Sequence, residues 1–523
     1  MNSCYQGMNS DFAEICNREI GIVPSRNFSR RFIASEVLQI SSFNSNLILN
    51  PFTHDRLNFD FGVNYLTSSF NSPLNFAMQT NVKQLNLEHK LNGHNGCVNA
   101  VEFNSTGDLL VSGSDDCKVI LWDWAINSKR FSYPSGHLDN IFQTKIMPFT
   151  DDQKIVTSAA DGKVRLGQVL GDGRVITQML GEHQGSVHEL AVEPGSPHIF
   201  YSCGEDGLVQ HFDLRNTSAR KLFYCTTFAE RSKHPPKTVE LNAIAIDPRN
   251  PNIFALGGSD EYARLYDLRN CRGDVTSSNR VVDTFCPHHL IQTNNFHITG
   301  LAFSNSSELL ITYSDELIYL FQKNMGLGPS PLTVSSENLL RELKRPQVYS
   351  GHRNSATVKG VNFFGPNAEY IVSGSDCGHI YIWKKKGAVL VKLMFGDHDV
   401  VNHIEPHPHL PILATCGIEN NIKIWTPMAS DVPPLPDDME QIMESNKQGR
   451  EDHSRVTLTP DVIVHALRLQ RRQTSVFTER RYNPADINSD EENEWEAYNL
   501  EVLDGNVSLE EDSTEHASEC NIS

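Results

Sequence analysis

The chain has 523 residues, of which 39% are hydrophobic, and a net charge of −19. This length allows one large domain with flanking segments. Thirteen of its acidic residues follow Arg481 with no lysine or arginine among them, so the rest of the chain carries only −6. A mildly acidic body lacks the clustered cations that nucleic acids bind.

No apolar run reaches the roughly 20 residues of a membrane span, and the first 20 residues lack the basic and then apolar layout of a signal peptide. The eleven cysteines are scattered singly without a Cys-x-x-Cys pair, which is typical of reduced thiols. We therefore expect a protein of the nucleus or cytoplasm that binds neither membranes nor nucleic acid directly.

One short phrase recurs seven times between Lys90 and Trp425, most clearly at 92–124 and 351–383. Each full copy has a Gly-His pair, an alternating apolar strand, a strand ending in Ser-Gly-Ser, a turn with Asp, and a strand ending in Trp-Asp. This order is the signature of one β-propeller blade. The repeat predicts an all-β, seven-bladed WD-repeat propeller.

Within a blade the pattern predicts a hydrogen-bonded chain from His through Ser to Trp, anchored by the turn Asp. Seven nearly equivalent sets indicate a repeated structural need, whereas catalysis needs one asymmetric site, so we expect no catalytic residue. Blade two has His137, Ser158 and Asp161 but no Trp, and blade six has Cys377 where the turn Asp is expected. The predicted structural network comprises His94, Ser112, Asp116 and Trp122 of blade one, His352, Ser373 and Trp383 of blade six, and Trp425 of blade seven.

Changes in composition divide the chain into three parts. Residues 1–82 form a mostly disordered N-terminal extension, 83–428 form the propeller, and 429–523 form a C-terminal extension. In this last part, a Pro near the start and arginines near the end predict a helix at 459–473, followed by a disordered acidic tail.

The last repeat stops after its third strand, so another segment must supply the fourth. The stretch from Leu85 to Leu91, just before the first Gly-His pair, is the natural candidate, because it would join the two ends of the ring. A proline at Leu87 is then expected to remove a hydrogen-bond donor of the sheet.

Two histidine-rich patches, CPHH at 286–289 and EPHPH at 405–409, have spacings that also occur in metal sites. Structural zinc needs four convergent ligands, and the interleaved prolines suit turns on a blade rim equally well. Hydrogen bonding at the rim is the favoured interpretation, with no metal. We expect no cofactor, because no phosphate-binding glycine loop or nucleophile elbow occurs.

Two blade ends differ from the others. HFDLRN at 211–216 and LYDLRN at 265–270 each place an arginine two residues after an aromatic-Asp pair. An arginine there can bind carboxylates or carbonyls of a partner, or pair with its own blade's aspartate at little energetic gain.

The string aromatic-Asp-x-Arg, preceded by a turn Asp, resembles the DWD box of WD-repeat substrate receptors for cullin-4 RING ubiquitin ligases. The segments FCPHHL and EPHPHLPILATCGIENNIKIWTP are similar to the DDB- and cullin-four-associated factor eight family. The segment LTPDVIVHALRLQRRQTSVFTERRY and the acidic end resemble the plant members of that family.

The resemblance implies a non-catalytic receptor that docks on the damaged-DNA-binding-protein adaptor and holds a protein substrate, whose identity the sequence does not reveal. The implied docking residues are Asp206, Phe212, Asp213 and Arg215 in blade three, and Asp260, Tyr266, Asp267 and Arg269 in blade four. Blade one departs from this motif, because Ala125 stands where the motif has arginine. The alternative is a WD-repeat scaffold that assembles another complex, unrelated to ubiquitin.

Overall fold

The computed structural model describes residues 81–216, 219–228, 237–271, 281–293, 295–331, 345–429 and 432–454. Almost all of the predicted N-terminal extension, the predicted helix at 459–473 and the acidic tail lie outside these residues. The chain divides into two compact units, 1–450 and 451–523. No helix in the described ranges is long and apolar enough to cross a membrane.

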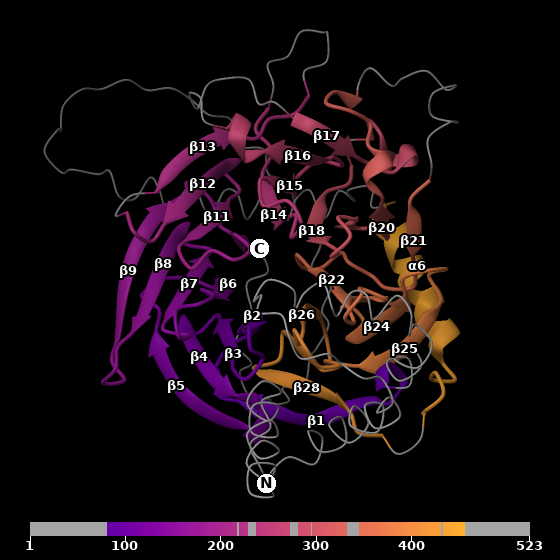
Figure 1. Ribbon diagram of the computed structural model, residues 1–523. Coiled ribbons are helices and arrows are strands. Elements are labelled where there is room, and N and C mark those ends of the chain that lie inside the picture. The colour runs from indigo at the N-terminus through magenta and orange to yellow at the C-terminus, as the bar shows by residue number, and fades with distance from the viewer. Residues whose placement is uncertain are drawn as a thin grey trace, which may run out of the picture. The chain divides into compact units, whose positions relative to one another are not determined.

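The described residues of the first unit form seven four-stranded antiparallel sheets arranged as blades around a ring (Figure 1), which confirms the predicted propeller. Blades one to three consist of β2 (Val98–Phe103), β3 (Leu110–Ser114), β4 (Lys118–Asp123) and β5 (Ser128–Pro134); β6 (Ile141–Ile146), β7 (Lys154–Ala159), β8 (Lys163–Val169) and β9 (Val175–Glu182); and β10 (Glu189–Val192), β11 (Ile199–Cys203), β12 (Leu208–Asp213) and β13 (Arg220–Tyr224).

The other four blades follow in chain order. Blades four and five consist of β14 (Leu241–Ile246), β15 (Ile253–Gly258), β16 (Ala263–Asp267) and β17 (Val281–Phe285), and of β18 (Ile298–Phe303), β19 (Leu309–Tyr313), β20 (Ile318–Phe321) and β21 (Gln347–Tyr349). Blades six and seven consist of β22 (Val361–Phe364), β23 (Tyr370–Ser373), β24 (His379–Lys384) and β25 (Leu390–Phe395), and of β26 (Val401–Pro406), β27 (Leu413–Gly417), β28 (Asn421–Pro427) and β1 (Leu85–Asn92).

The second strand of each blade is buried along nearly its whole length because neighbouring blades cover both of its faces. All five residues of β3 and of β27 are buried, for example. The core is therefore divided among interfaces between blades: Val98 and Trp122 of blade one share a cluster with Ile412 and Ile422 of blade seven.

The ring closes as the sequence predicts, through antiparallel pairing of β1 with β28. The pairing contains a bulge between Leu87 and His89. There the Leu87 amide donates to Asn86 Oδ1 at 3.0 Å. This local bond does not test the sheet hydrogen bonding of Leu87, which is paired with Trp425, so the effect of a proline at this position stays a prediction. Leu91, fully buried and paired with Ile422, is the residue that anchors the closure.

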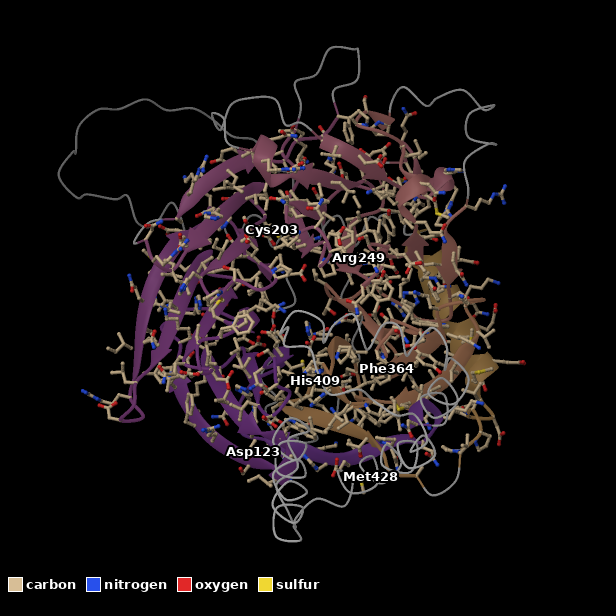
Figure 2. All side chains as sticks on the ribbon, in the orientation of Figure 1. Asp123, Cys203, Arg249, Phe364, His409 and Met428 are labelled. Carbon is tan, nitrogen blue, oxygen red and sulfur yellow. The ribbon has the colours of Figure 1, made fainter. Side chains whose placement is uncertain are left out.

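Antiparallel connectivity gives the ring two distinct faces. In every blade the turn between the second and third strands lies at one edge, which we call the turn face; it also receives the Gly-His segments. The turns after the first and third strands lie at the other edge, the hook face. On the hook face, the turns after first strands lie nearer the ring centre, as the positions of His409 and Asp123 show (Figure 2).

Blade one contains the complete predicted network. His94 Nδ1 donates to Asp116 at 3.2 Å, Ser112 Oγ lies 2.8 Å from His94 Nε2, and Trp122 Nε1 donates to Ser112 Oγ at 2.8 Å. Burial alone would raise the pKa of Asp116, but the bonds from His94 and from two backbone amides lower it to about 2. The network thus satisfies polar groups that the blade buries.

Other blades make the same links with different residues. In blade two, His137 binds Thr157 Oγ1 at 2.8 Å, and the predicted Ser158 is one position out of register and has no partner in the described structure. In blade four, which has no Gly-His pair, Arg264 donates to Asp260 Oδ1 at 2.8 Å and is almost fully buried. In blade seven, Trp425 Nε1 donates to Thr415 Oγ1 at 2.9 Å, and His398 Nδ1 binds Glu419, the acid at the turn position.

The network predicted for blade six is wrong. Ser373 Oγ donates to the Gly374 carbonyl and Trp383 Nε1 to the Ser350 carbonyl. His352 is fully buried, and its ring nitrogens have no hydrogen-bond partner among the described residues. Two differences from blade one explain the change: Cys377 replaces the turn Asp, and 21 residues instead of 18 separate the histidine from the serine.

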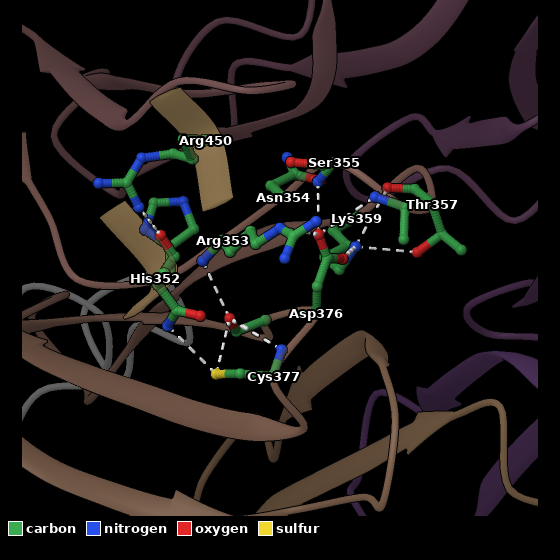
Figure 3. Close-up of polar contacts among 12 residues, drawn as sticks. His352, Arg353, Asn354, Ser355, Thr357, Lys359, Asp376, Cys377 and Arg450 are labelled. Atoms are coloured by element: carbon green, nitrogen blue, oxygen red, sulfur yellow. Dashed lines mark hydrogen bonds and ion pairs between the residues drawn. The ribbon is translucent and has the colours of Figure 1, made fainter. Parts of the chain in front are cut away.

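A helix that the sequence analysis did not predict covers this part of blade six. It is α6 (Met439–Ser454), which lies beside β21 and β24 (Figure 1). Asn446 Nδ2 donates to the Gly351 carbonyl at 2.8 Å and to Tyr381 Oη at 3.0 Å, and Arg450 donates to the His352 carbonyl. Figure 3 shows Arg450 above His352, with a separate ion pair of Lys359 and Asp376 to their right. Polar groups from α6 thus bind the backbone where the usual network is missing.

The difference between blades one and six predicts different costs for the same mutation. Ser112→Ala leaves two buried ring nitrogens, on His94 and Trp122, without a partner, and should lower the free energy of unfolding by about 2 to 4 kcal/mol. Ser373→Ala removes one bond to a backbone carbonyl and should cost about 1 kcal/mol or less. Urea denaturation of both variants measures the two losses. Equal losses would contradict this account.

The closure predicts a second contrast, between two leucines of β1. Leu91→Ala removes a fully buried side chain at the seam and should lower the free energy of unfolding by about 2 to 5 kcal/mol. Leu87→Ala, on the same strand but exposed, should change it by no more than about 0.5 kcal/mol. Thermal and urea unfolding compare the two; a large loss from Leu87→Ala alone would show that the bulge anchors the seam.

Candidate protein-interaction site

On the hook face of blade three, Arg215 is held by the aspartate that ends β12. Its Nε donates to Asp213 Oδ1 at 2.9 Å and its Nη2 to Asp213 Oδ2 at 2.8 Å. The Arg215 amide also donates to Asp213 Oδ1, at 3.0 Å, so the carboxylate fixes the turn as well as the side chain. The Arg215 side chain is nevertheless 63% exposed. We call this arrangement a hook.

Blade four repeats the hook. Arg269 Nε donates to Asp267 Oδ1 at 3.0 Å and Nη2 to Asp267 Oδ2 at 2.6 Å. Asp267 caps the short helical turn Leu268–Asn270 by accepting from the Arg269 amide. The Arg269 side chain is also 63% exposed. Two neighbouring blades therefore present the same arginine geometry on one face.

The ion pairs keep both hooks charged. The hydrogen bonds from Arg215 lower the pKa of Asp213 to about 2, and those from Arg269 lower the pKa of Asp267. Each guanidinium uses only two of its five N–H donors on its own aspartate. Each arginine thus pairs with the aspartate of its own blade, which was the predicted alternative to partner binding. This pairing leaves the other N–H donors of each guanidinium for a second acceptor.

The other four predicted docking residues lie elsewhere. Phe212 and Tyr266 are buried between blades and support the ends of the strands that carry the hooks. Asp206 accepts from His183 at 2.9 Å and Asp260 from Arg264, both on the turn face. The accessible groups of the predicted set are therefore the two hooks, and the turn aspartates hold the blades together.

The sequence analysis missed a third Asp-x-Arg pair on the same face. Arg174 Nε donates to Asp172 Oδ2 at 2.6 Å in the loop between β8 and β9. No aromatic residue precedes this aspartate, whose side chain is 49% exposed, compared with 14% for Asp213. The hook of blade two therefore depends on an aspartate in an exposed loop, whereas those of blades three and four depend on an aspartate at the end of a strand.

The histidine-rich patches make rim hydrogen bonds, as the favoured interpretation predicts. His407 and His409 each donate from Nε2 at 3.0 Å, to the carbonyls of Gly107 and Ser105, and so tie blade seven to blade one. His289 Nε2 lies 3.2 Å from Tyr319 Oη. In the described part of the chain, no group of three or more His, Cys, Asp or Glu side chains is arranged to hold a metal ion.

Two features that were not predicted differ in whether the sequence pattern indicates them. In α6, Met439, Ile442 and Met443 have the spacing of a helix face and contact the cluster between blades five and six. This spacing could have indicated the helix. The substitution of Arg264 for the blade-four histidine had no signal in the repeat pattern.

Comparison with known proteins agrees with this fold. A family model described as "WD domain, G-beta repeat" matches residues 85–123, 343–384 and 390–426. The chain is 35% identical over 326 residues to the Arabidopsis thaliana protein ALTERED SEED GERMINATION 2, covering 53% of this chain and 43% of that protein. It is 34% identical over 285 residues to human DDB1- and CUL4-associated factor 6, covering 51% of this chain and 31% of that protein. Human WD and tetratricopeptide repeats protein 1 is 24% identical over 582 residues, covering 66% of this chain and 85% of that protein.

The chain spans less than half the length of the Arabidopsis thaliana protein and of human DDB1- and CUL4-associated factor 6. The chain carries WD40 repeats, and these repeats build a seven-bladed β-propeller.

Proposed function

We propose that the chain is a non-catalytic, substrate-recruiting receptor of a cullin-4 RING ubiquitin ligase that docks on the damaged-DNA-binding-protein adaptor through the hooks of Arg215 and Arg269. Similarity to a protein named as associated with DDB1 and CUL4 supports this class of function. We further propose that the chain belongs to the DDB- and cullin-four-associated factor eight family and that it acts in the nucleus or cytoplasm.

The pair of hooks is the observation that carries the proposal. An exposed ion pair within one blade contributes little to stability, so stability alone does not account for two equal copies on adjacent blades. A guanidinium held by its own aspartate loses less conformational entropy when it binds a second acceptor. Planar arginine heads suit directional bonds to carboxylates and carbonyls of a protein partner.

The roles of the two faces follow from this. The adaptor would cover the hook face near blades three and four, which leaves the turn face for a protein substrate. Substrate identity would then depend on the loops of the turn face, where the repeat pattern imposes only the Gly-His pair and the turn aspartate.

Truncating the hooks should weaken capture of the purified adaptor. Arg215→Ala and Arg269→Ala should each lower affinity about tenfold, and the double change about a hundredfold, since buried arginine contacts are frequent hot spots. Surface plasmon resonance with immobilised adaptor measures this, and unchanged melting temperatures show that the variants are folded.

Arg174→Ala is the matched control, because it removes an Asp-x-Arg pair from the same face without touching blades three and four. It should bind as the wild type does. A folded double variant that retains wild-type affinity would refute docking through the hooks and favour a scaffold of another complex.

A further inference from the structure

The loop between β6 and β7 of blade two presents an exposed aromatic ring on the hook face. Phe149 is 76% exposed. The loop follows the first strand of its blade, so it lies at the same edge of the ring as the hooks. Its blade is next to the one that carries Arg215.

The backbone of this loop is left-handed at three residues and is unfavourable for one of them, Phe149. Phe149, Asp151 and Asp152 have φ angles of 55°, 52° and 57°. Only glycine, asparagine and aspartate visit this left-handed region readily, and a bulky side chain there is an outlier. Backbone strain of this kind is concentrated at sites of function.

The exposure of the ring is built into the loop. The Met147 amide donates to the Lys154 carbonyl at 2.9 Å and Thr150 Oγ1 to the Met147 carbonyl at 2.7 Å. Asn104 of blade one donates to Asp152 at 3.0 Å. With both ends of the loop bonded in this way, Phe149 is held outward on a fixed base.

The base of this loop also adjoins the hook of blade three. Met147 is fully buried in a cluster that includes Phe212, and Leu214 packs against the same cluster. These two residues flank Asp213, which holds Arg215. The aromatic ring and the first hook therefore project from one shared core.

We propose that Phe149 is an apolar anchor that inserts into a pocket of the protein bound by the hooks, on an adaptor surface that places acceptor groups beside the pocket. Asp151, exposed in the same loop, disfavours nucleic acid or an anionic membrane as the occupant. The inference rests on the proposed function, because it assigns the same adaptor to both features.

Phe149→Asn tests the anchor, since asparagine tolerates the left-handed backbone and lacks the ring. Adaptor affinity should fall at least about tenfold, while the melting temperature should stay the same or rise. Phe149→Leu keeps an apolar side chain and should retain most of the affinity. Phe149→Gly serves as a second ring-free variant with a relaxed backbone.

Val389→Asn is the matched control: Val389 is 61% exposed in the turn between β24 and β25, on the hook face of blade six. It should bind the adaptor as the wild type does. Hydrogen exchange adds a second readout, because the amides of 147–153 should gain protection when the adaptor binds the wild type.

The outcomes separate this inference from the proposed function. If Phe149→Asn and Phe149→Gly bind normally while the double arginine variant does not, the anchor is refuted and the function stands. If the wild type does not bind the adaptor, both are refuted. If the phenylalanine variants lose affinity and the arginine variants do not, the anchor is supported and the docking role of the hooks is refuted.

Discussion

The antiparallel pairing of β1 with β28 is the interaction on which the rest of the structure depends. Twenty-seven strands of the ring follow one another in blade order, and each blade covers a face of the next. Without β1, blade seven would have an open edge and the interface between blades seven and one would lose Leu91 from its core. His407 and His409 bind the same seam from the hook face, so strand pairing, apolar packing and side-chain hydrogen bonds all act where the two ends of the ring meet.

A closed ring also has to satisfy the polar groups that it buries, and the blades do this in different ways. Blade one uses His94, Ser112 and Trp122, whereas blade four uses the buried ion pair of Arg264 and Asp260. Blade six has a neutral histidine, since burial lowers the pKa of His352 to about 3. There α6 supplies donors to the neighbouring carbonyls. The repeat therefore conserves a place for a polar link in most blades, while the chemistry of that link changes.

The sequence predicted the number of blades, the closing strand and the network of blade one because the repeat spacing determines where strands and turns fall. It failed at blade six, where an insertion of three residues and Cys377 break the spacing while the letters Gly-His, Ser and Trp remain. It also missed α6, which follows the last repeat in the sequence and whose apolar face packs on the cluster that contains Trp383 and Leu393. The positions of the two arginines on the hook face could be predicted, but their bidentate pairing and the strained loop of Phe149 could not, because both depend on backbone angles.

The separation of the two faces links fold to function. Turn aspartates, such as Asp206, are occupied by histidine and backbone donors and so are unavailable to a partner. Aspartates at the ends of third strands, such as Asp213, instead hold an arginine whose remaining donors are exposed. The same residue type therefore stabilises the blade on one face and prepares a charged contact on the other. Because blades three and four have the same strand order, the hook at the end of the third strand of blade three recurs at the end of the third strand of blade four. This geometric repetition is what a propeller offers to a docking partner that a single loop does not.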